Sequence, residues 1–318
     1  MNKIYKDILT SKEIILYGAS SSGSRCINNL LFMGVNKSKI SFYDSNPEKQ
    51  GKKFLGVNVL TEESFLNKPK DILILISSCI KHEISLFLKN ENFTNYHYVH
   101  GLVYSNRFYE KFDAKFLDCM NKISTISNME YDELYTLYSS CLACKEIKGD
   151  IAEVGVYKGG SAFLMASVEQ GKNLYLFDTF EGLPSEENID IKGKKIDIQP
   201  DSGWLDDTSD KTTLDFVLKS GIDKDKVHIR KGWFPKTAEG LEDNKFSIVN
   251  LDSDLYQTTY DSLEYFFPRL SPGGRIISHD YNCLGCPGVK QAYKDYFGKL
   301  DMSHLLIEVA ESQVVVIK

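Results

Sequence analysis

Short apolar runs alternate with longer amphipathic segments along the chain, which predicts strands and helices in turn. In the first third, apolar runs at residues 13–17, 40–43 and 71–76 predict strands, and residues 24–33 predict a helix. This spacing is typical of a small Rossmann-like α/β domain, which we place at residues 1–105.

Residues 102–129 have mixed charges and no Pro or Gly, so we expect a helical linker, assigned to 106–129, rather than a flexible tether. The alternation resumes in a second domain at residues 130–318. Its predicted strands are residues 150–154, 173–177, 227–230, 247–251 and 275–278. Helices between these strands predict a doubly wound α/β sheet.

The last two apolar runs, residues 305–309 and 313–317, are separated only by a short turn and predict a terminal hairpin. Strands joined by a tight turn are antiparallel, so we expect one edge strand to oppose the rest of the sheet. This arrangement resembles that of class I methyltransferases.

The segment EVGVYKGGS, residues 153–161, has the pattern of a strand that turns sharply into a helix. Gly155 and the glycine pair before Ser161 allow the backbone to approach a ligand, and Ser161 is expected to open a helix over residues 162–170. Asp178 follows the next predicted strand, where a carboxylate can accept both hydroxyls of a ribose. Together these features predict a nucleotide-binding turn.

The residues of this turn are not those of a phosphate-binding turn. It lacks the Lys-Ser/Thr pair of a P-loop and the third glycine of a dinucleotide-binding turn, and it places Glu153 just before the turn. A carboxylate there suits a cation, which favours S-adenosylmethionine over a ligand that carries pyrophosphate. We expect Ser161 and the amides of the helix start to face the carboxylate of this cofactor.

Polar side chains follow two later strands of the predicted sheet: Asp252, Ser253, Asp254, His279, Asp280 and Tyr281. Ligands of such sheets bind at the carboxyl ends of the strands. Converging carboxylates are costly without a shared cation or proton, so we expect a divalent metal at Asp252, His279 and Asp280. The alternative for any one acid is a structural role, such as Asp254 capping a helix at residues 255–269.

The composition is that of an ordinary soluble protein, with 318 residues, 42% of them hydrophobic and 26% charged. The net charge of -6 argues against a nucleic-acid partner, because phosphate backbones require concentrated positive charge. The opening residues lack a signal-peptide core, and no apolar run reaches membrane-spanning length. We therefore expect a cytoplasmic protein without membrane insertion, and a homodimer as the commonest assembly.

The seven cysteines are expected to be thiols in a cytoplasmic protein. Two CxxC pairs, Cys141/Cys144 and Cys283/Cys286, have the spacing of zinc ligands. The first pair falls in a helical pattern, where such cysteines fill a core. The second lies in a loop beside the predicted site, where Cys286 could contact the substrate. Packing is the favoured interpretation, with zinc as the alternative.

Five segments, in order, resemble the TylF/MycF family of macrocin-type sugar O-methyltransferases: GDIAEVGVYKGGSA, LFDTFEGLP, RKGWFPKT, NLDSDLYQTTYDSLEYFFPRLSPGGRIISHDY and GVKQA. The likeness spans about residues 130–318, and EVGVYKGGS more distantly resembles the cofactor turn of catechol-type O-methyltransferases. The resemblance implies S-adenosylmethionine as cofactor and magnesium near Asp252 and the acidic pair before Tyr281. It implies cofactor contacts at Glu153, Gly155, Tyr157, Ser161 and Asp178, with Trp233 lining the site.

The chain departs from this family where two aspartates commonly precede the tyrosine, because it has His279 and Asp280 there. An imidazole is a poor magnesium ligand, a good ligand for manganese, iron or zinc, and a ready general base. Two mechanisms therefore stay open. In one, Asp252, His279 and Asp280 hold a cation that lowers the pKa of a sugar hydroxyl. In the other, no metal binds and His279 takes the proton.

The expected reaction is in-line attack of a hydroxyl oxygen on the sulfonium methyl group. We expect a sugar acceptor that is nucleotide-linked, part of a surface polysaccharide, or part of a glycosylated metabolite. The polar segment 186–210, which contains Trp204, is the expected lid. The alternatives are a small catechol-like acceptor, or a nucleotide-sugar-binding protein whose second domain has lost turnover.

The N-terminal domain carries a turn of its own, GASSSG, at residues 18–23. Ser20 occupies the position where a dinucleotide-binding turn has its middle glycine, which disfavours NAD. The stretch SNPEKQGKKFLGVNVL that follows Asp44 resembles the N-terminal domains of bacterial nucleotide-sugar-modifying enzymes. The resemblance implies a nucleotide-sugar site at Gly18, Ser20, Gly23 and Asp44, and a domain without a ligand is the alternative.

Overall fold

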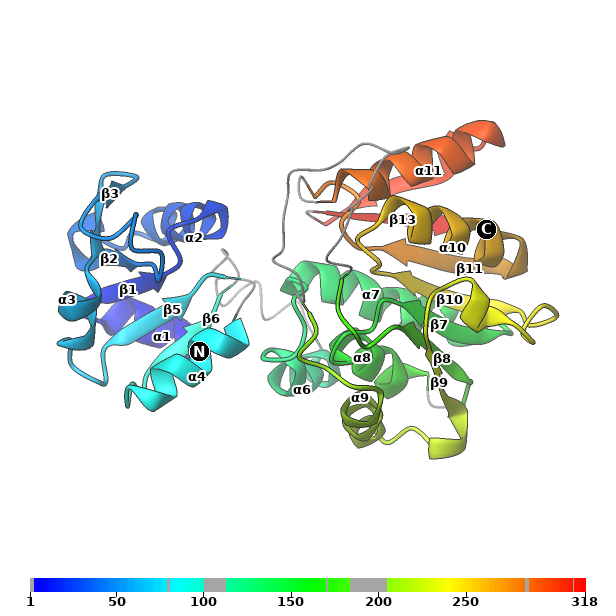
Figure 1. Ribbon diagram of the computed structural model, residues 1–318, viewed down its shortest axis with the longest axis horizontal. Helices are drawn as coiled ribbons and strands as arrows, with labels where there is room; N and C mark the ends of the chain where they lie inside the picture. Colours follow the sequence, from blue (N-terminus) through cyan, green and yellow to red (C-terminus); the bar gives the residue numbers. More distant parts are fainter. Residues whose placement is uncertain are drawn as a thin grey trace. The chain divides into compact units, whose positions relative to one another are not determined.

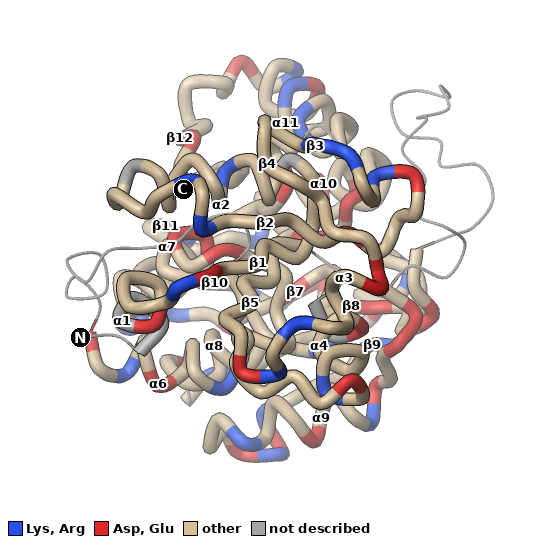
Figure 2. Tube along the Cα trace, turned by 90° about the vertical axis from the view of Figure 1, so that its left-hand side faces the viewer, with Lys and Arg blue, Asp and Glu red and all other residues tan. Residues whose placement is uncertain are grey.

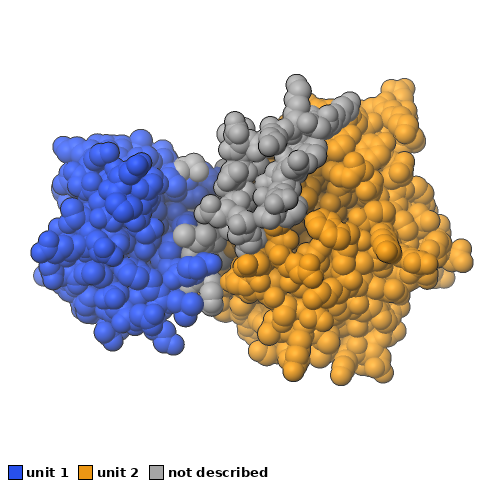
Figure 3. Space-filling model, viewed as in Figure 1, with its two compact units in different colours: residues 1–117 blue, residues 118–318 orange. Residues whose placement is uncertain are grey.

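The chain forms two compact units, residues 1–117 and 118–318 (Figure 3). The computed structural model describes residues 3–78, 81–99, 113–169, 171–183, 205–283, 286–310 and 312–318. The division falls within helix α6 (Ala114–Ile123), which forms part of the segment predicted as a helical linker. The predicted boundary at residue 105 lies outside the described residues.

Unit 1 is an α/β sandwich (Figure 1). Among its described residues, the strand order is β3-β4-β2-β1-β5-β6, and all neighbouring pairs are parallel except β3 and β4. The strands are β1 (Ile14–Tyr17), β2 (Ile40–Tyr43), β3 (Lys53–Phe54), β4 (Val57–Leu60), β5 (Leu73–Ile76) and β6 (Tyr96–Tyr98). The helices are α1 (Lys3–Thr10), α2 (Ser21–Phe32), η1 (Lys37–Lys39), α3 (Glu62–Leu66) and α4 (Lys81–Asn90).

Both faces of this sheet are covered, which explains why β1 reads as an unbroken apolar run. Leu16 belongs to a cluster with Ile8 of α1 and Leu30 of α2. Its neighbour Tyr17 belongs to the opposite cluster, which includes Leu88 of α4. The Rossmann-like architecture expected for the N-terminal domain is therefore confirmed.

Unit 2 contains a larger sheet with the order β12-β13-β11-β10-β7-β8-β9 among its described residues. The strands are β7 (Asp150–Val154), β8 (Leu174–Asp178), β9 (Val227–Lys231), β10 (Phe246–Leu251), β11 (Leu270–Ser278), β12 (Leu306–Val309) and β13 (Gln313–Ile317). Besides α6, the helices are α7 (Tyr131–Cys144), α8 (Gly160–Val168), α9 (Asp210–Val217), α10 (Tyr256–Arg269) and α11 (Pro287–Lys299). Short 3₁₀ segments are η2 (Leu218–Ser220), η3 (Lys224–Lys226), η4 (Lys236–Ala238) and η5 (Ser303–Leu305).

The doubly wound sheet and the terminal hairpin are confirmed, but the reversed strand is not at the edge. β13 runs antiparallel to both β11 and β12, and β12 takes the edge position. Val314 and Val316 of β13 are buried, whereas Ile307 and Glu308 of β12 are exposed. The more apolar of the two strands therefore fills the interior position, which a hairpin pattern alone does not specify.

The charged residues are mixed along both units, with Lys and Arg interspersed among Asp and Glu (Figure 2). Among the described residues, no helix is both long and apolar enough to cross a membrane.

Candidate functional site

Strands β8, β7, β10 and β11 are parallel neighbours in this spatial order, so their carboxyl ends lie side by side along one edge of the unit 2 sheet. The Gly155 N–H donates to the Phe177 carbonyl at 2.9 Å. A Cβ atom on Gly155 would lie 1.9 Å from the backbone oxygen of Asp252, and its φ of +82° favours glycine. The glycine turn after β7 is therefore packed directly against the loop that carries Asp252.

Asp178 fastens this turn to the end of β8. Its Oδ2 accepts hydrogen bonds from the N–H groups of Val156 at 2.6 Å and Tyr157 at 2.9 Å. Its Oδ1 accepts from the Phe180 N–H at 2.7 Å. A carboxylate has about four lone-pair sites, so with these three bonds in place Asp178 can still accept one ribose hydroxyl.

The turn leads into α8, which begins at Gly160, two residues before the predicted start. Gly159 is the N-cap residue in the left-handed conformation, with a φ of +82°. Ser161 therefore lies inside the first helical turn, where it is buried and acts to lower the pKa of Glu153.

The described end of the predicted lid contacts the same turn. The Tyr157 hydroxyl donates to Asp207 at 2.7 Å, and Lys158 forms an ion pair with Asp207. Thr208 donates its hydroxyl to the Tyr157 carbonyl at 2.7 Å. Residues 186–204 of this segment, including Trp204, lie outside the described residues.

Glu153 is completely buried in β7, and its Oε1 accepts from the Asn250 amide at 2.7 Å. Burial raises the pKa of this carboxyl to about 8, although the hydrogen bonds from Ser161 and Asn250 oppose the rise. Among the described residues, Glu153 Oε2 and Asn250 Oδ1 have no hydrogen-bond partner. The side chain is therefore mainly neutral at pH 7 and lies inside the sheet layer, and its contact with a cofactor stays a prediction.

His279 lies among three carboxylates at the end of β11. Its Nδ1 is 2.9 Å from Asp252 Oδ1 and 3.0 Å from Asp280 Oδ2, and its Nε2 is 3.1 Å from Glu133 Oε2. The structure thus brings together the three residues predicted at this site and adds Glu133 of α7. The sequence does not point to Glu133 as a site residue. Glu133 comes three residues after Glu130, and this spacing indicates a helix capping box, which the two residues do form.

The surrounding charges set the protonation of this cluster. Burial would lower the pKa of His279, but Asp280, Glu133 and Asp252 together raise it well above its ordinary value. Burial would raise the pKa of Glu133, but His279 dominates and lowers it to about 2. Both ring nitrogens therefore carry protons at neutral pH and donate to carboxylates. A ring in this state cannot accept a proton, so the geometry disfavours His279 as general base.

The same residues fit a divalent cation. One donor atom each from Asp252, His279 and Asp280 lies within 4.8 Å of the others. A cation can replace the proton on His279 Nδ1, while Nε2–H still donates to Glu133, the usual outer partner of a metal-bound imidazole. One nitrogen and two oxygen donors suit manganese, iron or zinc better than magnesium.

Asp254 is not the helix cap proposed as its structural alternative. The N-cap residue of α10 is Leu255, without a side-chain cap hydrogen bond, and Asp254 has a φ of +60°. Burial, then the charges of Asp280 and Asp252, raise the pKa of Asp254 well above its ordinary value. Asp254 therefore holds a proton beside Asp280.

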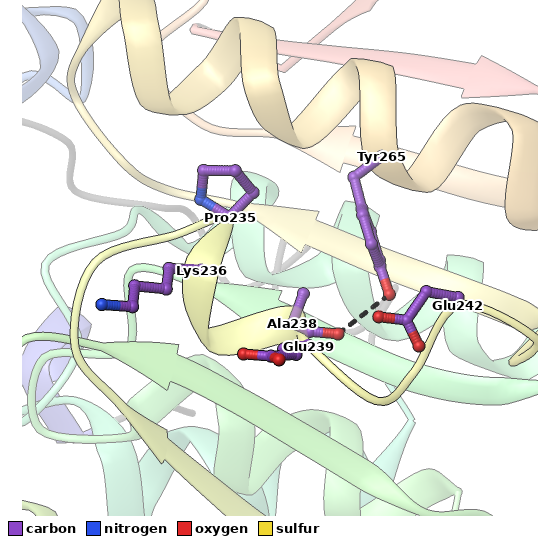
Figure 4. A pocket seen from close by; sticks show the side chains of 6 residues that line it. All are labelled: Pro235, Lys236, Ala238, Glu239, Glu242 and Tyr265. Carbon is purple, nitrogen blue, oxygen red and sulfur yellow. Dashed lines mark hydrogen bonds between the residues drawn. The ribbon is translucent and has the colours of Figure 1, made fainter.

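Trp233 is 54% exposed on the loop after β9. A cavity of about 370 Å³ lies next to it in sequence. Figure 4 shows the side chains that line this cavity, where the Tyr265 hydroxyl donates to the Ala238 carbonyl at 3.2 Å. The lining residues are Pro235, Lys236, Ala238, Glu239, Glu242 and Tyr265. This cavity includes no predicted site residue, and the contact of Trp233 with a cofactor stays a prediction.

In unit 1, Asp44 contacts the predicted ligand turn at Ala19. Asp44 accepts from the N–H groups of Ala19 at 2.9 Å and Asn46 at 3.0 Å, and it pairs with Lys49 at 2.9 Å. Ser20 caps α2. The two glycines are required by packing, since a Cβ atom on Gly18 would lie 2.5 Å from the Ser77 oxygen and one on Gly23 2.1 Å from the Gly18 oxygen. A nucleotide-sugar ligand here stays a prediction.

The strand order, the reversed β13 and the glycine turn after β7 define a class I methyltransferase fold. The chain belongs to the macrocin O-methyltransferase (TylF) family, whose model matches residues 123–316, and this confirms the predicted family.

The chain is similar to several curated enzymes over about half of its length. It is 32% identical over 170 residues to an 8-demethyl-8-(2,3-dimethoxy-alpha-L-rhamnosyl)-tetracenomycin-C 4'-O-methyltransferase of Streptomyces olivaceus, covering 51% of this chain and 63% of that protein. It is 27% identical over 178 residues to a mycinamicin III 3''-O-methyltransferase of Micromonospora griseorubida, covering 51% and 66%. The chain thus spans less than two thirds of the length of these relatives.

A solved structure supports the fold. The O-methyltransferase NovP superposes with a TM-score of 0.50 at 22% identity, covering 60% of this chain and 81% of that one.

Proposed function

We propose that this chain transfers the methyl group of S-adenosylmethionine to a hydroxyl group of a sugar on a glycosylated metabolite. The observation that carries the proposal is the contact between the glycine turn and the Asp252 loop, where a Gly155 Cβ would lie 1.9 Å from the Asp252 oxygen. It places a cofactor-type turn beside an acidic cluster at one sheet edge. Family membership supports the reaction, and the names of the relatives that act on rhamnosyl and mycinamicin compounds support the acceptor class.

The cofactor lies over the glycine turn in this proposal. Asp178 accepts one ribose hydroxyl while it keeps its bonds to the three backbone amides. Gly155 and Tyr157 contact the nucleoside, and Trp233 closes one side. Glu153 and Ser161, which are both buried, support the cofactor from the inner side of the turn.

The acidic cluster holds the acceptor hydroxyl and its proton. Asp252, His279 Nδ1 and Asp280 would hold a divalent cation, which lowers the pKa of a hydroxyl when bound. We assign to Asp252 the role of taking the proton from the acceptor hydroxyl. Glu133 holds the His279 ring in place by accepting a hydrogen bond from Nε2–H. Alignment of the hydroxyl oxygen with the sulfonium methyl is then the main contribution of the protein.

The test is transfer of a labelled methyl group to four classes of acceptor: glycosylated metabolites, nucleotide sugars, polysaccharide fragments and catechols. We expect transfer to a sugar hydroxyl and its loss in Asp252→Asn. Activity that falls when a chelator is added and returns with manganese supports a role for a divalent cation in the reaction. Transfer only to catechol-type acceptors, or none to any class by protein that binds the cofactor, contradicts the proposal.

A further inference from the structure

The loop between β11 and α11 gathers two thiols beside an acidic side chain. The Cys283 N–H donates to the Asp280 carbonyl at 3.1 Å, and the Cys286 N–H donates to the Cys283 carbonyl at 3.2 Å. Donor atoms from Asp280, Cys283 and Cys286 all lie within 4.8 Å of one another. Cys286 Sγ is also 3.6 Å from Asp254 Oδ1.

Two sulfurs and one or two carboxylate oxygens form a donor set for a thiophilic cation. Zinc binds cysteine sulfur at about 2.3 Å and carboxylate oxygen at about 2.0–2.2 Å, so donors around a tetrahedral zinc ion lie about 3.3–3.8 Å apart. The present spacing needs only a small closing movement of side chains. Cys283 and Cys286 are both partly exposed, which leaves a path for an ion.

The second CxxC pair shows that the spacing alone does not create such a site. Cys141 and Cys144 lie within α7 and are fully buried. Cys144 Sγ faces the Gly273 carbonyl at 3.7 Å. In the described part of the chain, no group of metal-ligating side chains includes either of them. This pair packs in the core, as predicted, and serves as an internal comparison.

We propose that Asp280, Cys283 and Cys286 bind zinc or another thiophilic divalent cation, with Asp254 in reach as a fourth donor. This donor set differs from Asp252, His279 and Asp280 in chemistry, because it contains sulfur. Asp280 belongs to both sets, so an ion held by the thiols draws on a ligand of the neighbouring set.

Cobalt titration of the metal-free, reduced, full-length protein tests this site, because thiolate-bound cobalt has a near-ultraviolet charge-transfer band that nitrogen and oxygen ligands do not give. We expect the band in the unmodified protein and in Asp252→Asn. We expect it to vanish in Cys283→Ser/Cys286→Ser and to persist in the matched control Cys141→Ala/Cys144→Ala. Circular dichroism checks that each variant is folded.

Zinc affinity, measured in the Asp252→Asn background by competition with a chromophoric chelator, gives the size of the effect. Loss of both thiolates should weaken zinc binding by more than about 100-fold. Loss of a residue that only orients a metal ligand already weakens metal binding by about 10–100-fold, and loss of the ligands themselves should weaken it more. No charge-transfer band in the unmodified protein, or a band that survives in Cys283→Ser/Cys286→Ser, overturns the proposal. A band lost only in the Cys141/Cys144 variant also overturns it. Neither cofactor nor acceptor enters these measurements, so their outcome is independent of the proposed reaction.

Discussion

Replacement of Glu153 by Gln should change how the stability of unit 2 depends on pH. Glu153 is fully buried, and its pKa rises from 4.5 in the unfolded chain to about 8 in the folded one. Between these values the unfolded chain releases a proton that the folded chain keeps. The unfolding free energy of the unmodified protein therefore falls as pH rises, by about 1.36 kcal/mol per pH unit from this group.

Over the whole range from pH 4.5 to about pH 8, this group lowers the unfolding free energy of the unmodified protein by about 5 kcal/mol. A glutamine side chain cannot ionise and has a similar size, so this contribution is absent from the variant. Glu153→Gln should therefore gain stability relative to the unmodified protein as pH rises through this range. Above about pH 8 the difference between the two proteins should become constant.

Urea unfolding followed by tryptophan fluorescence is the suitable assay, because both tryptophans, Trp204 and Trp233, belong to unit 2. Glu146→Gln is the matched control, because Glu146 is exposed just after α7. The difference in unfolding free energy between this variant and the unmodified protein should not change with pH. A difference between Glu153→Gln and the unmodified protein that does not change with pH would refute the reasoning.

The other predictions concern the site itself. Asp178→Ala should weaken S-adenosylmethionine binding at least tenfold in calorimetry, because hydrogen bonds to a charged group contribute about 1.5–3 kcal/mol each; unchanged affinity would remove its ribose role. Asp252→Asn should lower kcat by about 100-fold or more and leave cofactor affinity within about threefold, and an active variant would exclude it as base or ligand. Gly155→Ala should destabilise unit 2 by about 3 kcal/mol or more in urea unfolding, because its Cβ would meet a backbone oxygen. A stability equal to that of the unmodified protein would contradict this. Glu133→Gln should lower the His279 pKa, measured by NMR titration of the ring, because one of three carboxylates is lost; an unchanged pKa would show that Glu133 does not hold the imidazolium.

Much of the fold could be predicted from the sequence because buried parallel strands are short apolar runs. β10, with every residue buried, and β7 begin and end within a residue of their predicted bounds. The position of β13 could not be predicted in the same way. A hairpin pattern fixes the direction of two strands relative to each other, but not which of them pairs with β11.

The acidic cluster was predictable in part, since Asp252, His279 and Asp280 follow strands that end at one sheet edge. Glu133 was not, because it comes from a helix more than a hundred residues earlier, and only the folded chain brings it to His279. The burial of Glu153 was missed for a related reason. A strand residue just before a turn can point into the layer or out to the ligand, and its neighbours in sequence do not decide which.

The most direct test of the account is a crystal structure of the full chain with S-adenosylhomocysteine. The account predicts a ribose hydroxyl hydrogen-bonded to Asp178 and the sulfur atom facing the loop that carries Asp252. A nucleoside bound elsewhere, or a sulfur atom that points away from Asp252 and Asp280, would contradict it.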